Sequence, residues 1–267
     1  MTVTTSPHAG KTALPTWNAI IQAHVLFFSQ VMSLLRLTIV WLLIVFIVNA
    51  SMNWMVWPAE VANWPATNHF SEIAFCVSTV LVTLAGSSIA VSWHRAILLD
   101  EPIKYAPMMR LDAIVQTYFA AALFLTLMGL LPVMTLVRMT EGGNTPPLIA
   151  LAMTCLSLAM AVWIAVRLIP LFPAIACDED HISMGQAWLQ TRGQFWRLFL
   201  GSVATLALPI IAAVAVLMID PNLSVDGPPS DRTAFAIFNA AIDTIMLFFG
   251  LIATAFASLI YRAIRDR

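Results

Sequence analysis

Charged residues are scarce in this sequence, which is 10% charged and 60% hydrophobic. Soluble domains usually carry about 25% charged and about 45–50% apolar residues, so the composition excludes an ordinary soluble globular protein. The 13 basic and 14 acidic residues nearly balance, and the net charge of −1 says nothing useful about nucleic acid. From the composition we expect an integral membrane protein, and the expected partners include no nucleic acid.

Cysteine and histidine are also sparse, and neither forms a recognisable ligand pattern. Cys76, Cys155 and Cys177 lie far apart in apolar surroundings, without the short spacing of a zinc or redox site. The five histidines are dispersed, and none belongs to a His-Glu-x-x-His pair on one helix face. Because no catalytic or cofactor motif is found either, we expect no metal, no cofactor and no enzymatic activity.

Long apolar runs dominate the chain, and each is near the length of about 20 residues that crosses a hydrocarbon core about 30 Å thick. The six runs cover residues 37–57, 73–98, 111–137, 147–172, 197–219 and 234–261. They predict an all-α fold, a polytopic membrane helix bundle of six transmembrane helices with cytoplasmic interfacial helices, in one membrane domain over residues 1–267. The apolar segment from Trp17 to Leu35 precedes the first run, so we expect no cleaved signal peptide.

The basic residues are unevenly distributed between the two sides of the predicted bundle. An even number of spans places both termini on one side, and 11 basic residues flank the span ends there against two, Arg138 and Arg232, at the other ends. The 11 are Lys11, Arg36, Arg95, Lys104, Arg110, Arg167, Arg192, Arg197, Arg262, Arg265 and Arg267. Because positive residues near span ends are retained inside, both termini are predicted to be cytoplasmic. Trp54, Trp57 and Trp64 fit the opposite headgroup layer.

The two long cytoplasmic connections share an order of features, which indicates a parallel hairpin repeat of residues 73–137 and 147–219. In each, a tryptophan and an arginine end one helix, acidic residues follow, and the next helix reaches a Leu-Pro pair at Pro132 or Pro209. A shared bias toward basic residues inside could produce part of this pattern without duplication.

The second connection predicts an amphipathic helix. Ser183 and Gln186 have the spacing of a capping box, which satisfies free N–H groups at a helix start. Met184, Ala187, Trp188 and Phe195 follow at helical spacing and would form an apolar face in the headgroup plane. The candidate lipid-headgroup contacts are Arg167, Trp188, Arg192 and Arg197. A simple connecting helix is the favoured alternative, because two arginines fall short of the 4–8 basic residues of anionic-lipid sites.

A resemblance accompanies this region. The run from Arg167 to Pro173, the acidic Asp178-Glu179-Asp180, and Ala187-Trp188-x-x-Thr191-Arg192 with Arg197 resemble a pattern in bacterial six-helix membrane proteins. These proteins are similar to the membrane domain fused to some bacterial glycerophosphodiester phosphodiesterases. The resemblance covers about residues 164–209. It implies a bacterial inner-membrane protein and implies no activity, because the membrane part of that family has no catalytic residues to carry over to this sequence.

Asp243 is the one acidic residue well inside a predicted span, roughly 15 Å deep at 1.5 Å per residue. An unpaired carboxylate at that depth costs a few kcal/mol, so Asp243 is expected to face the bundle. Its candidate partners are Asn49, Ser51, Ser78, Thr79 and Asn239, of which Asn49 and Asn239 complete the candidate intramembrane site. The site is interpreted either as a proton or substrate relay or, preferably, as a structural hydrogen bond between helices.

Small residues four apart, as in Gly86/Ala90 and Ala253/Ala257, predict close helix packing. The same faces would suit a homo-oligomer, so the expected partners are membrane lipids together with a second copy or another membrane protein.

Three functions compete. The first is a non-enzymatic scaffold or accessory protein acting through lipid or protein contacts, and the alternative is a small permease or channel that uses Asp243. An intramembrane enzyme ranks third, because it needs clustered nucleophiles, acids or metal ligands. A dry, filled bundle would favour the scaffold, and a continuous polar cavity from Asp243 to the cytoplasmic rim would favour transport.

Overall fold

The computed structural model describes residues 15–61, 69–102, 110–141, 147–178, 183–218 and 232–266. The secondary structure in these stretches consists of helices without strands, which confirms the predicted all-α fold. The helices are α1 (Thr16–Ser29), α2 (Val31–Val61), α3 (His69–Leu98), α4 (Ala113–Glu141), α5 (Pro147–Arg167), α6 (Leu171–Ala176), α7 (Met184–Gln190), α8 (Phe195–Leu217), α9 (Arg232–Phe249) and α10 (Leu251–Arg265).

Six segments of the described chain are long and apolar enough to cross a membrane, as the sequence predicts. They are Val31–Met55, Ile73–Leu98, Ala113–Leu136, Leu148–Arg167, Phe195–Ala215 and Thr233–Arg265, the last of which joins α9 and α10. The protein is therefore a polytopic helical membrane protein. Pro132 lies inside α4 and Pro209 inside α8, at the predicted matching positions, and the hairpin repeat itself stays a prediction.

One predicted span boundary is corrected by the structure, and one confirmed span consists of two helices. The fourth span was expected to reach residue 172, but α5 ends at Arg167, because Pro170 has no N–H to continue the helix and instead precedes the short α6. The sixth span is divided at Gly250 into α9 and α10. The Gly250 N–H still donates to the Met246 carbonyl at 2.9 Å, so the two helices follow each other closely.

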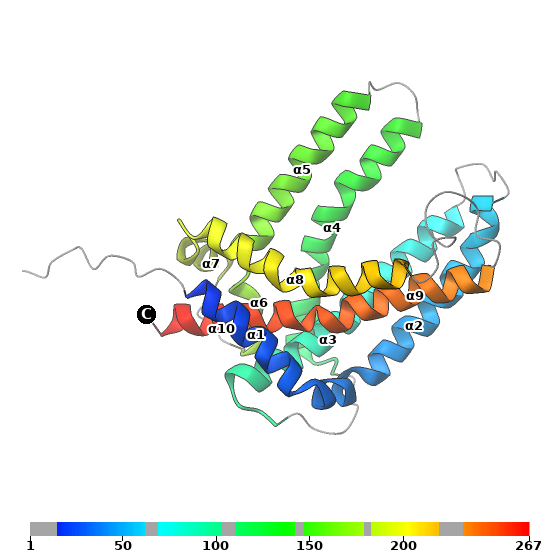
Figure 1. Cartoon of the computed structure of the whole chain (residues 1–267). Helices are drawn as coiled ribbons and strands as arrows, with labels where there is room; N and C mark the ends of the chain where they lie inside the picture. Colours follow the sequence, from blue (N-terminus) through cyan, green and yellow to red (C-terminus); the bar gives the residue numbers. More distant parts are fainter. Residues whose placement is uncertain are drawn as a thin grey trace, which may run out of the picture.

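The packed core lies where α1, α2, α3, α8 and α10 meet. Its largest members include Phe27, Trp93, Leu198 and Phe256, which belong to one contiguous cluster of buried side chains. Helix α9 runs beside α2 and α8, as Figure 1 shows. The core thus joins the first and last helices of the described chain.

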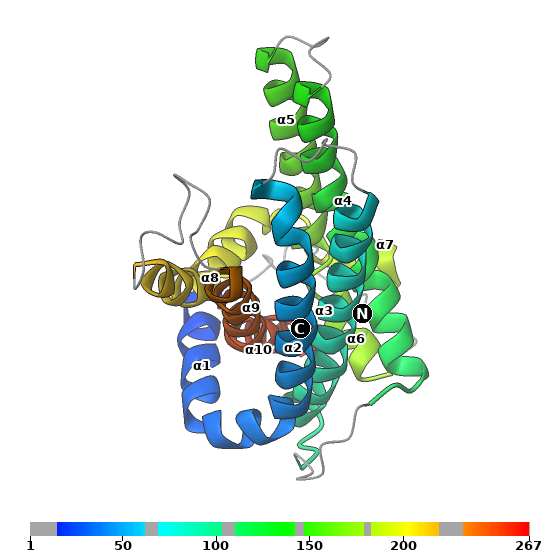
Figure 2. The ribbon, with the colours of Figure 1, turned by 90° about the vertical axis from the view of Figure 1, so that its right-hand side faces the viewer.

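The α4–α5 hairpin diverges from the remaining long helices. We call the end of the bundle at which α1 begins and α10 ends the terminal end, and the opposite end the far end. At the terminal end α4 packs on α3 and α6, whereas toward the far end the hairpin leans away from α2 and α9 (Figures 1 and 2). Leu131 of α4 and Leu156 of α5 are accordingly 61% and 66% exposed. The bundle is therefore wedge-shaped and opens at the far end.

Candidate functional site

Three helices bring together a polar cluster around Asp243, which we call the Asp243 cluster. The Asn49 side chain of α2 donates from Nδ2 to Asp243 Oδ2 of α9 at 2.8 Å. Ser78 of α3 donates from its hydroxyl to Asn49 Oδ1 at the same distance of 2.8 Å. Because Ser78 occupies the amide oxygen, the amide NH₂ of Asn49 is directed to the carboxylate.

Burial differs sharply within the Asp243 cluster. Asn49 is 1% exposed, whereas Asp243 is exposed at the surface of the cavity described below. Asn239, the other predicted member of the site, does not join it, because its Nδ2 donates to the Phe235 carbonyl of its own helix at 2.9 Å. Ser51 likewise donates to its own helix, at the Ile47 carbonyl. Asn49 and Ser78 are therefore the candidate partners that the structure places at Asp243.

A cavity of about 1290 Å³ lies between α2, α3, α4, α9 and α10, and Asp243 is part of its wall. Along α3 its lining extends from Ala74 to Ala90, which corresponds to about 24 Å of helix. Its polar lining residues are Asn49, Asn53, Ser78, Thr79, Thr83, Ser87, Tyr118, Thr126, Asp243 and Thr254. A space of this size exceeds the usual 300–1,000 Å³ of small-molecule sites, so it can accommodate a ligand together with water.

Buried polar and aromatic side chains close the cavity toward the terminal end. His94 of α3 is fully buried, with Nδ1 2.7 Å from the Ser258 hydroxyl of α10 and Nε2 3.2 Å from the Tyr118 hydroxyl of α4. Trp93 donates from Nε1 to the Leu251 carbonyl at 3.2 Å. Tyr118 lines the cavity, so the His94 network forms part of its floor. Among the described residues the cavity lining therefore stops short of the terminal rim, so the continuous polar cavity that would favour transport is not formed in this conformation.

The sequence reasoning missed His94. His94 has no metal-ligand spacing to another histidine, so no motif distinguishes it. The available signal was its position inside an apolar span, where an imidazole needs hydrogen-bonding partners from other helices.

Arg167 is buried among protein groups at 6% exposure, which does not fit the predicted lipid-headgroup contact. Its guanidinium donates to the carbonyls of Trp188 and Thr191, the latter at 2.8 Å, where α7 ends. The same group lies over the Trp188 ring at 4.8 Å, and Trp163 packs edge-on against that ring. These hydrogen bonds connect the end of α7 to the end of α5. The positive charge of Arg167 also complements the negative end of the α7 dipole.

The predicted amphipathic helix is shorter than expected. The capping box of Ser183 and Gln186 is present at the start of α7, but this helix ends at Gln190. Gly193 has a φ of 77°, which L-residues with a side chain rarely adopt, and the chain turns there before α8 begins. Phe195 consequently belongs to α8 and shares no helix face with Trp188.

The remaining predicted headgroup contacts differ in their surroundings. Arg192 and Arg197 are exposed at the terminal end, and Trp188 is partly buried against Arg167. Several residues that the sequence reasoning singled out lie outside the described part of the chain: Lys11, Trp64, Lys104, Glu179, Asp180 and Arg267.

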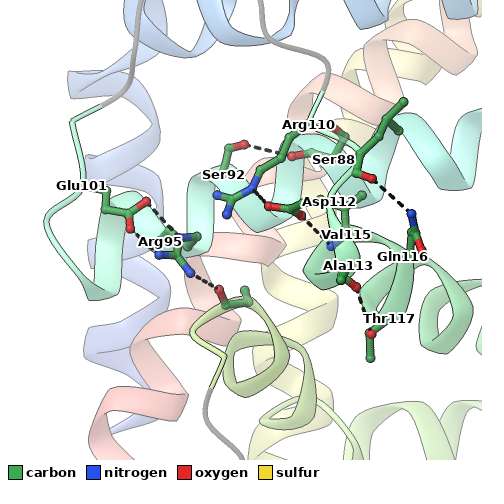
Figure 3. A network of polar contacts seen from close by, with 12 residues as sticks. Ser88, Ser92, Arg95, Glu101, Arg110, Asp112, Ala113, Val115, Gln116 and Thr117 are labelled. Carbon is green, nitrogen blue, oxygen red and sulfur yellow. Dashed lines mark hydrogen bonds and ion pairs between the residues drawn. The ribbon is translucent and has the colours of Figure 1, made fainter.

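A second arginine joins α3 to α6 at the terminal end. Arg95 donates from Nε to Glu101 Oε2 at 2.9 Å, pairs with the second Glu101 oxygen, and donates to the Ala176 carbonyl at 3.0 Å (Figure 3). Arg262 of α10 similarly donates to the Ile97 carbonyl. Basic residues at this end therefore bind carbonyls near the ends of neighbouring helices.

Asp112 caps the start of α4. Its Oδ1 accepts from the Val115 N–H at 3.1 Å and its Oδ2 from Arg110 Nε at 2.6 Å, as Figure 3 also shows. Burial raises the pKa of the Asp112 carboxyl, but the hydrogen bonds from Arg110 and Val115 lower it more, so this pKa lies below its ordinary value.

No group of three or more histidine, cysteine, aspartate or glutamate side chains that could hold a metal ion occurs among the described residues. The fold and the cavity together define a polytopic helical membrane protein with a pocket of mixed polar and apolar lining between its helices. Comparison with protein-family models, with curated proteins and with solved structures finds no match. The resemblance to the membrane domains of glycerophosphodiester phosphodiesterases stays a prediction.

Proposed function

We propose that this protein is a small, non-enzymatic permease that takes up a solute in the cavity beside Asp243. The single observation that carries the proposal is the cavity itself. Its lining extends over about 24 Å of helix α3, and the hydrocarbon core that a transmembrane helix crosses is about 30 Å thick. A scaffold needs no such space, since helices that only support partners are stabilised by filling their interior.

The shape of the cavity supports an alternating-access cycle. Asp243 lies toward the far end, whereas the His94 network and Trp93 close the terminal end. A solute would enter from the far end, and release would require the α4–α5 hairpin to move relative to α3. This hairpin suits such a motion, because its far half has few neighbours among the described helices.

The proposed location is the bacterial inner membrane, with both termini cytoplasmic and with lipids around the bundle. The 11-to-2 distribution of basic residues supports this orientation. A thiol probe at Asn144 or Ser224, in a background without native cysteines, tests it. External, membrane-impermeant maleimide should label either probe in intact cells, and labelling only after the cytoplasm is opened would reverse the orientation.

Transport is tested with purified protein in lipid vesicles and a panel of glycerol, glutamate and tetraphenylphosphonium. Thr79→Trp with Thr83→Trp narrows the cavity, because both residues belong to its lining. Val77→Trp with Val80→Trp is the matched control, since these residues are exposed on α3 outside that lining. Wild type and control should take up at least one solute faster than empty vesicles, and the narrowed variant should lose this uptake.

Uptake of none of the three solutes above the empty-vesicle rate would contradict the permease proposal. Equal uptake by the narrowed variant and the control would contradict the route through the cavity.

Solvent access to the cavity is tested independently with cysteines. Cys76 lines the cavity and is exposed, so a neutral, water-soluble maleimide should label it after Cys155 and Cys177 are replaced by Ala. Thr83→Cys should also react in a background without Cys76, whereas Val80→Cys should not, because it would face lipid. Equal labelling at positions 80 and 83 would contradict a water-accessible cavity.

A further inference from the structure

We propose that the cavity selects organic cations and that the Asp243 carboxylate is their counter-charge. This inference rests on the proposed function, because it names the class of solute that the same cavity takes up.

The charge of the cavity wall is the first argument. Asp243 is the only Asp, Glu, Lys, Arg or His among the described residues that line the cavity. Its one side-chain hydrogen bond comes from the neutral amide of Asn49, and no described basic residue forms an ion pair with it. A carboxylate at membrane depth needs a compensating positive charge or a proton, and here no positive side chain of the described chain supplies that charge.

The geometry of the Asp243 cluster is the second argument. Ser78 fixes the buried Asn49 amide so that its NH₂ donates to Asp243 Oδ2. The amide donor occupies one position on Oδ2, so the remaining lone pairs of the Asp243 carboxyl oxygens stay available to a ligand. Since Asp243 is exposed in the cavity, a cation inside the cavity can reach it directly.

The rest of the lining suits an apolar body attached to that positive charge. Met52, Met134 and Met246 line the cavity together with several leucines, Val82 and Phe75. Methionine side chains are flexible and polarisable, and they adapt to ligands of different shapes. The combination of one carboxylate with an adaptable apolar wall predicts amphipathic cations such as amines and quaternary onium compounds.

Two probes of the same shape and opposite charge test the inference. Tetraphenylphosphonium and tetraphenylborate each carry four phenyl groups, so the central charge is what separates their binding to the cavity. Equilibrium dialysis against the full-length protein in neutral detergent, with protein-free micelles as the blank, measures both. We expect saturable binding of tetraphenylphosphonium at least about tenfold tighter than that of tetraphenylborate, because the Asp243 carboxylate attracts the cation and repels the anion. Equal binding of the two ions, or binding of neither, would overturn the inference.

Variants connect this selectivity to the Asp243 cluster. Asp243→Asn should weaken tetraphenylphosphonium binding about tenfold or more and leave tetraphenylborate unaffected. Ser78→Ala should weaken it by a smaller factor, because it frees the Asn49 amide to rotate. Thr244→Val is the matched control, since its hydroxyl donates to the Ala240 carbonyl of α9 and does not line the cavity. Unchanged cation binding by Asp243→Asn would overturn the role of this carboxylate.

The outcomes also separate this inference from the permease proposal. Cation binding that depends on Asp243, with no uptake of any solute into vesicles, would support the selectivity and contradict transport. Uptake of glycerol or glutamate without cation binding would support transport and contradict the selectivity. If Asp243→Asn fails to fold, the comparison of the two ions in the wild-type protein still decides the inference.

Discussion

The terminal end and the far end of this bundle differ in how deeply their side chains are buried. At the terminal end, Trp93, His94 and Tyr261 are at most 1% exposed, and arginines bind the carbonyls of neighbouring helices. At the far end, Asp243 is exposed in the cavity and Leu131 on the diverging α4 is 61% exposed. The bundle is thus closely packed at its terminal end and open at its far end.

This difference indicates where stability and function are located. Backbone and side-chain polar groups inside a membrane protein need internal partners, and the terminal end provides them for His94, Arg95 and the Nη1 and Nη2 groups of Arg167. At the far end the carboxylate of Asp243 keeps bonding capacity for a ligand. We therefore expect substitutions at the terminal end to change the free energy of unfolding, and substitutions at the Asp243 cluster to change ligand binding.

The largest expected effect concerns Trp93. Trp93→Ala removes a buried indole and its hydrogen bond to Leu251, so it should lower the free energy of unfolding by about 3–5 kcal/mol. Leu156→Ala, on the 66% exposed surface of α5, should change it by less than about 0.5 kcal/mol. Unfolding in mixed detergent micelles, followed by circular dichroism, measures both. Similar losses for the two variants would remove the contrast between the ends.

Arg167 should give the next effect. Arg167→Ala leaves the Trp188 and Thr191 carbonyls without this partner, which should cost about 2–3 kcal/mol. Hydrogen exchange should then accelerate over residues 184–191, the segment that Arg167 fastens. The exposed Arg192 is the control, and Arg192→Ala should change stability by less than about 0.5 kcal/mol. A large effect of Arg192→Ala would show that charge at this end matters more than the bonds of Arg167.

Gly201 and Gly129 allow the packing around α8 to be compared with the packing around α4. A Cβ at Gly201 of α8 would overlap with the Phe256 ring of α10, whereas a Cβ at Gly129 of α4 would meet nothing within 4 Å. Gly201→Ala should therefore destabilise the protein by about 1–3 kcal/mol. Gly129→Ala should stabilise it by up to about 1 kcal/mol through helix propensity. Thermal unfolding of the two variants side by side checks the opposite signs.

The smallest expected effect concerns pH and Asp112. The native pKa of this carboxyl lies below the ordinary value of 3.8, so its stabilising contribution is complete above 3.8 and is lost as the pH falls through the native pKa. Asp112→Asn retains an N-capping group and should cost less than about 0.5 kcal/mol at neutral pH, because the ion pair is largely solvated. Unfolding measured in parallel across pH should show this difference vanish in acid. A difference that persists below the native pKa would contradict the assignment.

Much of the fold could be predicted from the sequence. Hydropathy located the six spans, and the spacing of Ser183 and Gln186 located the start of α7. The ends of α5 and α9 were harder, because a proline three residues beyond a helix end or a glycine within an apolar run interrupts the helix only in some tertiary settings.

The candidate site could be predicted in part. The cost of burying a carboxylate required Asp243 to face other helices, and Asn49 and Ser78 were among its candidate partners. Asn239 lies one turn away from Asp243 on the same helix, but its amide is satisfied by the Phe235 carbonyl, which no sequence pattern reveals. Arg167 was assigned to lipid because its burial depends on where α7 folds back.

The sequence by itself determined that this chain crosses a membrane with six helices, because bilayer thickness fixes the length of an apolar helix and the cost of charge keeps such helices apolar. The tertiary structure alone decided which polar groups meet. Hydropathy carries no information on how each helix is rotated or which helices are neighbours, and lipid-facing and protein-facing surfaces are equally apolar. Only the packing of α2, α3 and α9 therefore brought Asn49, Ser78 and Asp243 together, and only the divergence of α4 and α5 left a cavity beside them.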